Sequence, residues 1–503
     1  MTLSKVKAVE RILFILMIVC LPFNHFPVKF PIAGNDLANV CILLGLVTVI
    51  YEILCFRTPL ERMEKYILAF IGISILWLVI SSIHGLLIYP YEIGDYSFSR
   101  VYLLLKSILD WCTGGGLSED AVKKIALSFN IMRSPFGNVL FTYFIIFYTY
   151  HIYKSDGKKG FYDAGRAVII LVSCMAVYSL FEVGYLLGNE TCKAILKSIN
   201  PFFMQLNISG SWWPPILWAG QVRSLFAEPS FLGICSAMFF PFLAYYSVNG
   251  QKWRFGRILL FFLFTVMVFL TRSRTAVVIM LAELLLFAFP VFLQKTISVK
   301  KFAKLLLLVA AAFCVSLFLL SHFANTPKHE VTKAEVSTKI SSYVEENVTS
   351  AVGTKRSNNA RHAESLTRLR IGLEHPVFGV GQGLDTQYVV DNFTEEDLEN
   401  YEVRQWCRGV TEDGPLKVGI GSFNYLAYLI CTEGMPGLIL FLSFPFYFAW
   451  HYLRNLKKLK LATAILGISY MGSLAALFSN SPFASLYILS GLLLCFINYN
   501  NLN

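Results

Sequence analysis

Residues 258–294 read ILLFFLFTVMVFLTRSRTAVVIMLAELLLFAFPVFLQ, two apolar runs on either side of the polar sequence TRSRT. An apolar helix of about 20 residues can cross the hydrocarbon core of a bilayer, because it satisfies its own backbone hydrogen bonds. Two such runs joined by so short a connection predict a helical hairpin that crosses a membrane twice. The fold of the whole chain then depends on how often such runs recur.

The composition agrees with this pattern over all 503 residues, of which 56% are hydrophobic and only 15% charged. Soluble domains contain roughly 25% charged residues, so a water-soluble globule is excluded. The apolar runs predict twelve spans, near residues 11–27, 38–56, 66–89, 137–153, 167–187, 231–249, 258–271, 275–294, 305–321, 423–453, 461–479 and 483–498. We expect an all-α polytopic membrane protein whose first span is retained rather than cleaved as a signal peptide.

The positive charges give the expected orientation of these spans. If the N-terminus is cytoplasmic, about half of the 43 lysines and arginines fall in six short internal loops, as the positive-inside rule requires. Both termini would then be cytoplasmic. The other basic residues face outward. Together with the formal net charge of +11, they favour an anionic partner at the membrane over nucleic acid.

Three long segments are predicted on the outer side, at residues 90–136, 188–230 and 322–420. The last is the largest, and we expect it to be a partly helical periplasmic loop before the tenth span. Residues 1–321 would then hold spans one to nine, and residues 421–503 the last three. This distribution of polar sequence favours chemistry at the outer face.

The predicted spans themselves contain few charged residues, and the main ones are Glu182 and Glu283. Transporters usually keep their loops short and place polar groups near the middle of the membrane. A dedicated ion-coupling pathway is therefore poorly supported. No metal-ligand spacing occurs, and the glycine-rich turn at residues 375–383 lacks the context of a nucleotide site, so neither a metal nor a cofactor is expected.

The second outer segment ends with the sequence QVRSLFAEPSF at residues 221–231. Pro229 is tolerated in the first turn of a helix, and Glu228 would lie at the positive end of that helix. Arg223 and Glu228 are thus held at the membrane edge, where partial desolvation strengthens their interactions. We predict that both are catalytic, and the alternative is a simple ion pair between them.

The connection TRSRT places Arg272 and Arg274 at the outer end of the hairpin. Guanidinium groups at this depth are costly unless they meet anionic headgroups or a phosphorylated ligand. Snorkelling of either side chain to the interface is the alternative. Two arginines beside hydroxyl side chains favour diphosphate binding, and we predict that both bind substrate.

The large loop contains the sequence NNARHAESLTRLRIGL at residues 358–373, which has helical spacing. One face would carry Arg361, Ser365 and Arg368, and another Leu366, Leu369 and Leu373. This predicts an amphipathic helix with a cationic stripe. Such a helix lies on the bilayer, or it grips a lipid-linked anion, with Arg361 as a catalytic residue and Arg368 as a substrate-binding one.

A glycine-rich turn, HPVFGVGQG, follows at residues 375–383. A nucleotide site would need a preceding strand and a following helix in the cytoplasm, so this interpretation is rejected. Gly379 and Gly381 are predicted to let the backbone approach a substrate or to pack against a neighbouring helix. Residues 422–437 then predict a helix broken near the outer face, with Asn424 near its start as a further substrate-binding residue.

These motifs resemble those of the O-antigen polymerases (Wzy) and O-antigen ligases, a superfamily of bacterial GT-C-type membrane glycosyltransferases. The matching pieces are Arg223 with residues 228–230, residues 271–276, the Arg361 helix as far as Gly381, and residues 424–437. Their order, the twelve spans and the large loop before the tenth span also agree. The resemblance implies a metal-independent enzyme of the bacterial inner membrane with a periplasmic active site.

One position departs from the superfamily pattern, because the ligases carry a His-Asn pair before the tenth span where this chain has Phe423-Asn424. This favours a polymerase, which moves a growing glycan from undecaprenyl diphosphate onto an incoming lipid-linked repeat unit of O-antigen, capsule or a related polysaccharide. A ligase that transfers polymer to lipid A core is the closest alternative, and a lipid-linked oligosaccharide flippase is another. The implied partners are the undecaprenyl diphosphate-linked oligosaccharide and membrane lipids, with a chain-length regulator and a flippase as protein partners.

The resemblance also implies roles for the residues. Arg361 and Arg223 would bind the diphosphate through paired N–H donors, and Arg272 and Arg274 would add positive charge. Glu228 would be the general base toward the acceptor hydroxyl. The alternative bases are His375, Asp385, Glu412 and Asp413.

Overall fold

A computed structural model describes residues 2–94, 96–114, 117–204, 220–249, 254–323, 356–455 and 459–501. Over these residues the chain is helical and contains no strand, which confirms the predicted all-α class. Parts of two predicted outer loops, residues 205–219 and 324–355, lie outside the described residues.

The helices of the first half are α1 (Leu3–Val19), α2 (Leu37–Phe56), α3 (Arg62–Ile88), α4 (Arg100–Thr113), α5 (Glu119–Leu140), α6 (Tyr143–Tyr153), α7 (Gly157–Leu186), α8 (Glu190–Ile199) and the short η1 (Asn200–Phe202). Those of the second half are α9 (Pro229–Asn249), α10 (Arg254–Leu270), α11 (Arg274–Phe292), α12 (Val299–His322), α14 (Arg356–Glu374), α15 (Asp385–Asp391), α16 (Glu395–Glu399), α17 (Tyr401–Asp413), α18 (Tyr425–Asn455), α19 (Leu461–Ala475), η3 (Ala476–Phe478) and α20 (Ala484–Asn501).

Eight helices of the described chain are long and apolar enough to cross a membrane: α2, α3, α7, α9, α11, α12, α18 and the stretch Leu461–Phe478. All eight coincide with predicted spans. The other four predicted spans overlap the shorter helices α1, α6, α10 and α20, although α1 ends at Val19 and covers only about half of the span predicted at 11–27. A polytopic membrane protein is therefore supported, and the count of twelve spans stays a prediction.

The predicted span at 137–153 needs a correction, because the chain breaks between α5 and α6. The Thr142 hydroxyl donates a hydrogen bond to the Asn138 carbonyl oxygen at 2.5 Å. A threonine side chain that bonds to the backbone in this way competes with the helix ladder. Thr142 itself has φ −130° and ψ −84°, outside the helical region. The first part of the predicted span therefore belongs to α5, which begins at Glu119 within the loop predicted at 90–136.

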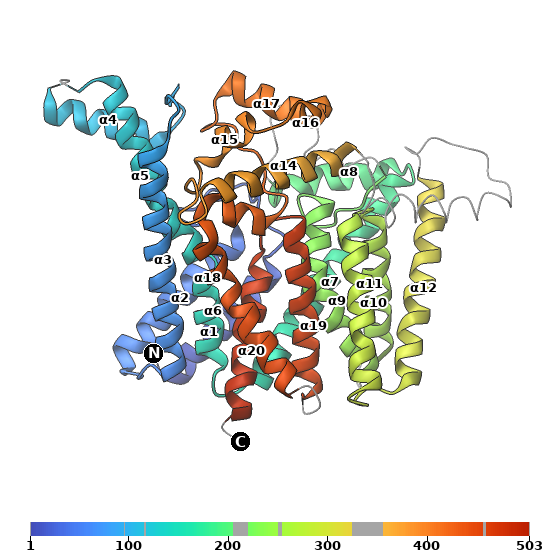
Figure 1. The fold of residues 1–503 in the computed structure, drawn as a ribbon. Coiled ribbons are helices and arrows are strands. Elements are labelled where there is room, and N and C mark those ends of the chain that lie inside the picture. The colour runs from blue at the N-terminus through green and yellow to red at the C-terminus, as the bar shows by residue number, and fades with distance from the viewer. Residues whose placement is uncertain are drawn as a thin grey trace.

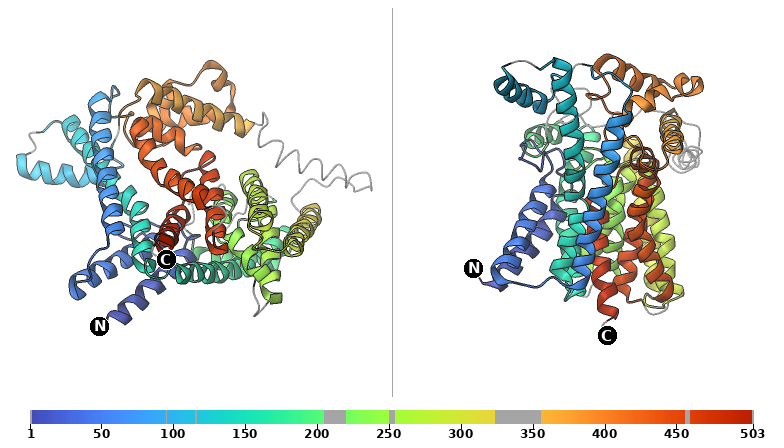
Figure 2. Two further views of the ribbon diagram at one scale, coloured as in Figure 1. Left: turned by 60° about the horizontal axis from the view of Figure 1, so that its bottom comes forward. Right: turned by 60° about the vertical axis from the view of Figure 1, so that its left-hand side comes forward.

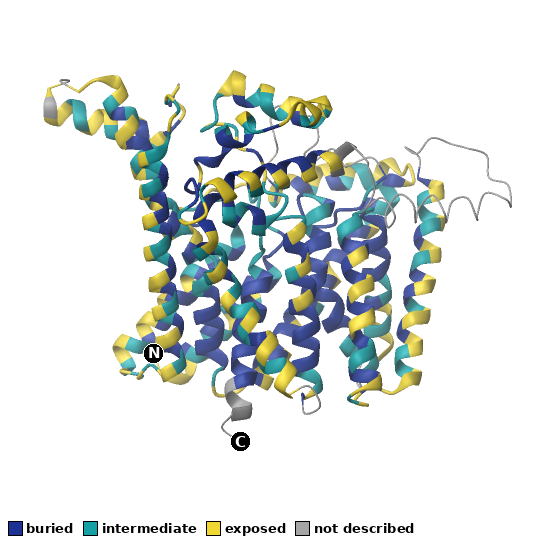
Figure 3. Ribbon diagram, viewed as in Figure 1, coloured by how far each residue is buried: buried dark blue, intermediate teal, exposed yellow. Residues whose placement is uncertain are grey.

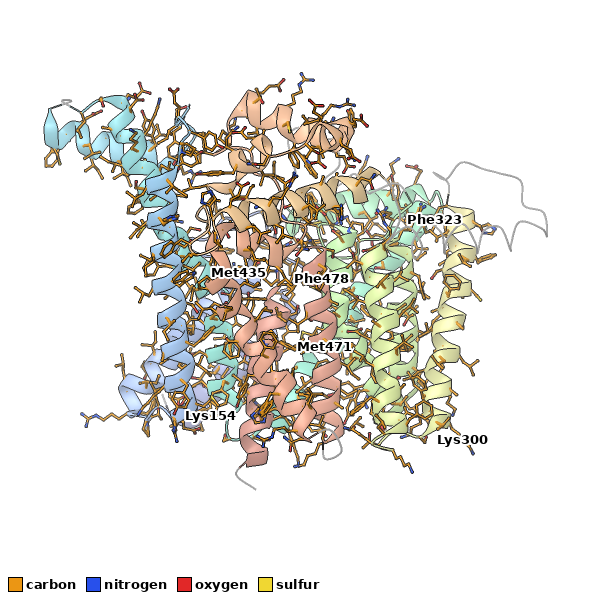
Figure 4. All side chains as sticks on the ribbon, viewed as in Figure 1. Lys154, Lys300, Phe323, Met435, Met471 and Phe478 are labelled. Atoms are coloured by element: carbon orange, nitrogen blue, oxygen red, sulfur yellow. The ribbon has the colours of Figure 1, made fainter. Side chains whose placement is uncertain are left out.

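The membrane helices stand side by side, and α14 to α17 lie over one end of them (Figure 1). Two further views agree that both chain termini lie toward the opposite end (Figure 2). We call these the loop end and the terminal end. Lys154 and Lys300, from two of the loops predicted to be cytoplasmic, both lie at the terminal end (Figure 4).

Burial differs strongly between the helices (Figure 3). In α9, 83% of the apolar stretch is buried, whereas in α12 the share is only 22%. A helix that is apolar all round and buried is a central one, while exposed apolar side chains on a peripheral helix suit contact with lipid. The central α9 begins at Pro229. The predicted motif at residues 228–230 therefore lies at the loop end, over the middle of the bundle.

The loop helices are fixed to the bundle by the glycine-rich turn. Val380 and Gly381 donate backbone hydrogen bonds to the carbonyl oxygens of Cys431 and Thr432, at 2.8 and 3.0 Å. This contact is possible because α18 is broken at Gly434, which has φ 70° and ψ −172°. The broken helix predicted for this segment is thus confirmed. Gly379 and Gly381 are buried in this joint and serve close packing.

Replacing Gly379 by alanine is expected to destabilise the joint. Its φ of +66° is left-handed, and a Cβ there would clash with the backbone of Thr432 and Glu433. The left-handed conformation alone costs about 1–3 kcal/mol for a residue other than glycine. Thermal unfolding in detergent and limited proteolysis of α14 to α17 would measure the loss. Gly419, where an added Cβ meets nothing within 4 Å, is the control, and equal behaviour of the two variants would contradict the packing role.

Candidate active site

Two of the sequence motifs form one unit at the loop end. The backbone N–H of Val222 donates to the carbonyl oxygen of Leu270 at 3.0 Å, which ties the 220–231 segment to the hairpin turn. A Cβ at Gly233 would lie 2.8 Å from the Ala276 Cβ, so α9 and α11 pack closely near their first turns. Their N-termini, which favour negative charge, therefore lie side by side.

The third motif brings Arg361 to the same place. Its guanidinium carbon lies 4.9 Å from the centroid of the Phe423 ring, a cation–π contact. Arg361 also interacts electrostatically with Arg274, with Glu228 and with Glu402 of α17. We call Arg274, Glu228, Arg361 and Glu402 the loop-end charge cluster. Residues from four separate segments are thus close enough to interact electrostatically at the loop end.

The electrostatics of this cluster suit an anionic ligand. Burial lowers the pKa of the Arg361 guanidinium, and the neighbouring Arg274 lowers it further, while the carboxylates of the cluster oppose both effects. An anion placed between the two arginines would relieve their repulsion. Neighbouring groups desolvate the guanidinium, but the residue as a whole keeps an exposed surface, so it can reach such a ligand.

Glu228 is held beside the arginines and only partly exposed. The Ser230 hydroxyl donates to Glu228 Oε2 at 3.0 Å. Burial raises the pKa of the Glu228 carboxyl above its ordinary 4.5, and Ser230 and Arg361 counteract the increase. A carboxyl group with a raised pKa is a better proton acceptor when ionised, which is what a general base needs.

Arg223 does not reach this cluster. Its side chain is 1% exposed and donates to the Phe226 carbonyl oxygen at 2.8 Å and to the Tyr178 hydroxyl at 3.1 Å. Glu182 accepts from the backbone N–H groups of Arg223 and Ser224, at 3.4 and 2.7 Å. The ion pair with Glu228, considered above as the alternative to a catalytic role, is replaced by one with Glu182, whose Oε1 lies 3.9 Å from Arg223 Nε. Arg223 thus holds the 220–231 segment against α7.

Arg368 is also inside the protein, with 0% of its side chain exposed. It forms ion pairs with Glu364 and Asp385, and its Nη2 donates to the Ile420 carbonyl oxygen at 3.1 Å. The predicted cationic stripe is therefore wrong in part, because the Arg368 face of α14 is turned inward while Leu366 and Leu373 are exposed. The buried charge is tolerated because two carboxylates oppose it.

Two other predicted substrate-binding residues, Asn424 and Arg272, lie at the ends of helices. Asn424 caps α18, since its Oδ1 accepts from the N–H groups of Leu426 and Ala427 at 3.1 and 3.2 Å. Arg272 is partly exposed in the hairpin turn, with a left-handed φ of 51°. It lies near the charge cluster in sequence, two residues before Arg274.

The alternative bases lie away from the cluster or are already paired. Asp385 pairs with Arg368. Glu412 and Asp413 are exposed at the end of α17, where they pair with Arg408 and Lys417. His375 packs its ring against Tyr388 at a centroid distance of 6.1 Å. Glu228 is therefore the carboxylate of this set that interacts with Arg361.

Glu402 was not among the sequence-predicted residues. It lies in the first turn of α17, and it reaches the cluster because α17 packs on α14 through a small apolar core that includes Val403 and Ala360. No spacing in the sequence indicates that contact. The aromatic contact of Arg361 with Phe423 depends on the same packing.

Comparison with known proteins agrees with the resemblance seen in the sequence. Residues 259–410 match the family model Wzy_C, described as O-antigen ligase. The matched range includes Arg272, Arg274, Arg361 and Glu402 and supports membership of the O-antigen ligase and polymerase superfamily. Searches of curated proteins and of solved structures gave no match.

Proposed function

We propose that this chain, which carries an O-antigen ligase family domain in residues 259–410, is an oligosaccharide repeat-unit polymerase. It would transfer a growing glycan from undecaprenyl diphosphate onto a lipid-linked repeat unit at the periplasmic face of a bacterial inner membrane. The observation that carries the proposal is the convergence of Arg274, Arg361 and Glu228 at the loop end. Such a set can hold a diphosphate and accept a proton.

In the proposed reaction, a hydroxyl oxygen of the incoming repeat unit attacks the anomeric carbon of the growing glycan. The bond from that carbon to the phosphate oxygen breaks, and undecaprenyl diphosphate leaves with the electron pair. Glu228 takes the hydroxyl proton. Arg361 and Arg274 stabilise the negative charge that develops on the diphosphate, and the helix N-termini of α9 and α11 add to the field.

Phe423 supports the polymerase over the ligase. The ligase pattern has a histidine at this position, whereas here the Phe423 ring supports the Arg361 guanidinium. A histidine-dependent step is therefore absent at this position, and the arginine gains a rigid apolar platform. The ligase stays the second candidate, because the matching family is described by that name.

Purified protein in detergent or nanodiscs, supplied with undecaprenyl diphosphate-linked repeat units alone, tests the proposal. Products longer than one repeat unit, with release of undecaprenyl diphosphate, are expected. Product formation only after lipid A core is added would establish the ligase instead. Transport of the substrate across liposomes without any new glycosidic bond would establish a flippase.

The pH dependence of the reaction tests Glu228. A base acts in its ionised form, so the rate should fall as the pH drops through the raised pKa of Glu228, above the ordinary 4.5. Glu228→Gln should lower the rate about 100- to 10,000-fold and remove this acid limb. Glu190→Gln, at an exposed glutamate of α8, is the control. A Glu228→Gln variant with the wild-type profile would rule out this base.

A further inference from the structure

A second polar cluster lies at the terminal end of the bundle, remote from the loop end. Glu10 of α1, Glu52 of α2 and His151 of α6 are all buried there. One ligand-type atom from each, a carboxylate oxygen or an imidazole nitrogen, lies within 4.8 Å of the others. We propose that these three residues bind a divalent transition-metal ion, with Zn²⁺ as the probe.

Unsatisfied atoms of this cluster point to a ligand. Glu10 is 0% exposed and its carboxylate oxygens accept no hydrogen bond, although Lys7 Nζ lies 4.0 Å from Oε2. His151 Nε2 is likewise buried without a hydrogen bond, and it lies 3.6 Å from Glu52 Oε2. Buried polar atoms in proteins are nearly always paired, and a buried carboxylate needs a compensating partner. Of the three residues, Lys7 lies within hydrogen-bond distance of Glu52 alone, whereas a divalent cation among them would contact all three.

His151 is oriented for metal binding by a second carboxylate. Its Nδ1 lies 2.5 Å from Glu64 Oε1, and the other oxygen of Glu64 accepts from Lys154 Nζ at 2.6 Å. Glu64 can accept from Nδ1 of the ring, and this contact holds the imidazole so that Nε2 faces Glu52. A carboxylate–histidine pair of this kind is the usual support of a metal-ligating imidazole.

The distances and charges of this cluster also fit a bound zinc ion. Ligands of tetrahedral zinc at about 2.0–2.1 Å lie about 3.4 Å apart, close to the 3.6 Å between His151 Nε2 and Glu52 Oε2. Two carboxylates and a neutral imidazole around a divalent ion make a neutral site. Nitrogen and oxygen donors in this combination select borderline ions such as Zn²⁺ over Mg²⁺ or Ca²⁺.

Lys7 would compete with the metal ion for the carboxylates of Glu52 and Glu10. Its Nζ lies 2.7 Å from Glu52 Oε2 and 4.0 Å from Glu10 Oε2, and its side chain is 36% exposed. It can therefore turn toward solvent when the ion enters. The metal would then join α1, α2 and α6 at the terminal end, a role that does not depend on the proposed glycosyl transfer.

Metal content of the purified full-length protein tests the proposal. After chelation and reloading with Zn²⁺, one zinc per chain should remain through gel filtration, and zinc should raise the unfolding temperature. X-ray absorption should show nitrogen and oxygen ligands, because zinc held by any of the free cysteines would show sulfur. Glu10→Gln and His151→Gln should each weaken binding at least about 10-fold.

Lys7→Ala sharpens the test, because removal of the competing ammonium should preserve or tighten zinc binding. Glu61→Gln, at an exposed glutamate of the same end, is the matched control and should bind zinc like the wild type. Wild-type protein without stoichiometric zinc, sulfur ligation, or full binding by Glu10→Gln and His151→Gln would each overturn the site. Protons shared among the three residues would then account for their burial.

Discussion

Arg361→Ala is expected to lower the rate of polymer formation by about 100-fold or more, with the unfolding temperature close to that of the wild type. The guanidinium lies on the Phe423 ring beside Arg274, where it can hold a diphosphate oxygen as charge develops. Removal of one well-placed donor to a developing anion typically costs about 100- to 1,000-fold in rate. Because Arg361 is exposed and Glu228 is only partly buried, the loss of Arg361 leaves no fully buried charge unpaired.

Two further variants separate charge from geometry in this prediction. Arg361→Lys should recover the rate only in part, since an ammonium cannot form the planar double contact or stack on the ring in the same way. Arg408→Ala removes an equally positive side chain from α17 that pairs with Glu412 rather than with the charge cluster, and should leave the rate unchanged. Wild-type chain lengths from Arg361→Ala would refute the assignment, and full recovery by lysine would mean that charge alone suffices.

The apolar runs predicted most of the fold because a membrane span leaves a strong local signal. The eight long spans and the break at Gly434 follow from composition and from one Gly-Met-Pro-Gly sequence. The break at Thr142 could not be predicted, because it depends on one side-chain hydrogen bond. The small helices α15 to α17 carry too short a pattern to be recognised without their packing on α14.

For the charged residues too, local sequence indicated some features of the site, while others depend on the packing of distant segments. Glu228 and Arg274 were predicted from their positions at helix ends, and Arg361 from its face of a predicted helix. In the structure all three are close enough to interact electrostatically. The sequence also singled out Arg223 and Glu182, but not their pairing, since the two lie on different segments. An arginine at the membrane edge has the same local pattern whether it faces a ligand or a buried carboxylate, so only the fold distinguishes Arg223 from Arg361.

Arg368→Ala is expected to have the largest effect on stability of the variants considered. The change would leave Glu364 and Asp385 buried without the cation that both contact. Burial already raises the pKa of Glu364, and Arg368 is the main group that opposes the shift. Breaking a buried ion network by removal of one partner costs about 3–5 kcal/mol. Thermal unfolding in detergent and proteolysis of α14 to α17 would measure the loss.

The alternative for Arg368 is direct contact with substrate, and matched variants distinguish the two. Arg370→Ala, at an exposed arginine of the same helix 3.5 Å from Asp397, should change the unfolding temperature little. Arg368→Met combined with Glu364→Gln and Asp385→Asn removes all three charges and should recover much of the stability, because no buried carboxylate is left bare. An Arg368→Ala protein as stable as the wild type but inactive would instead show that this guanidinium acts on the substrate. If Arg368 has a structural role, the Arg368→Ala protein loses the fold of α14 to α17 first, and its activity falls as a consequence.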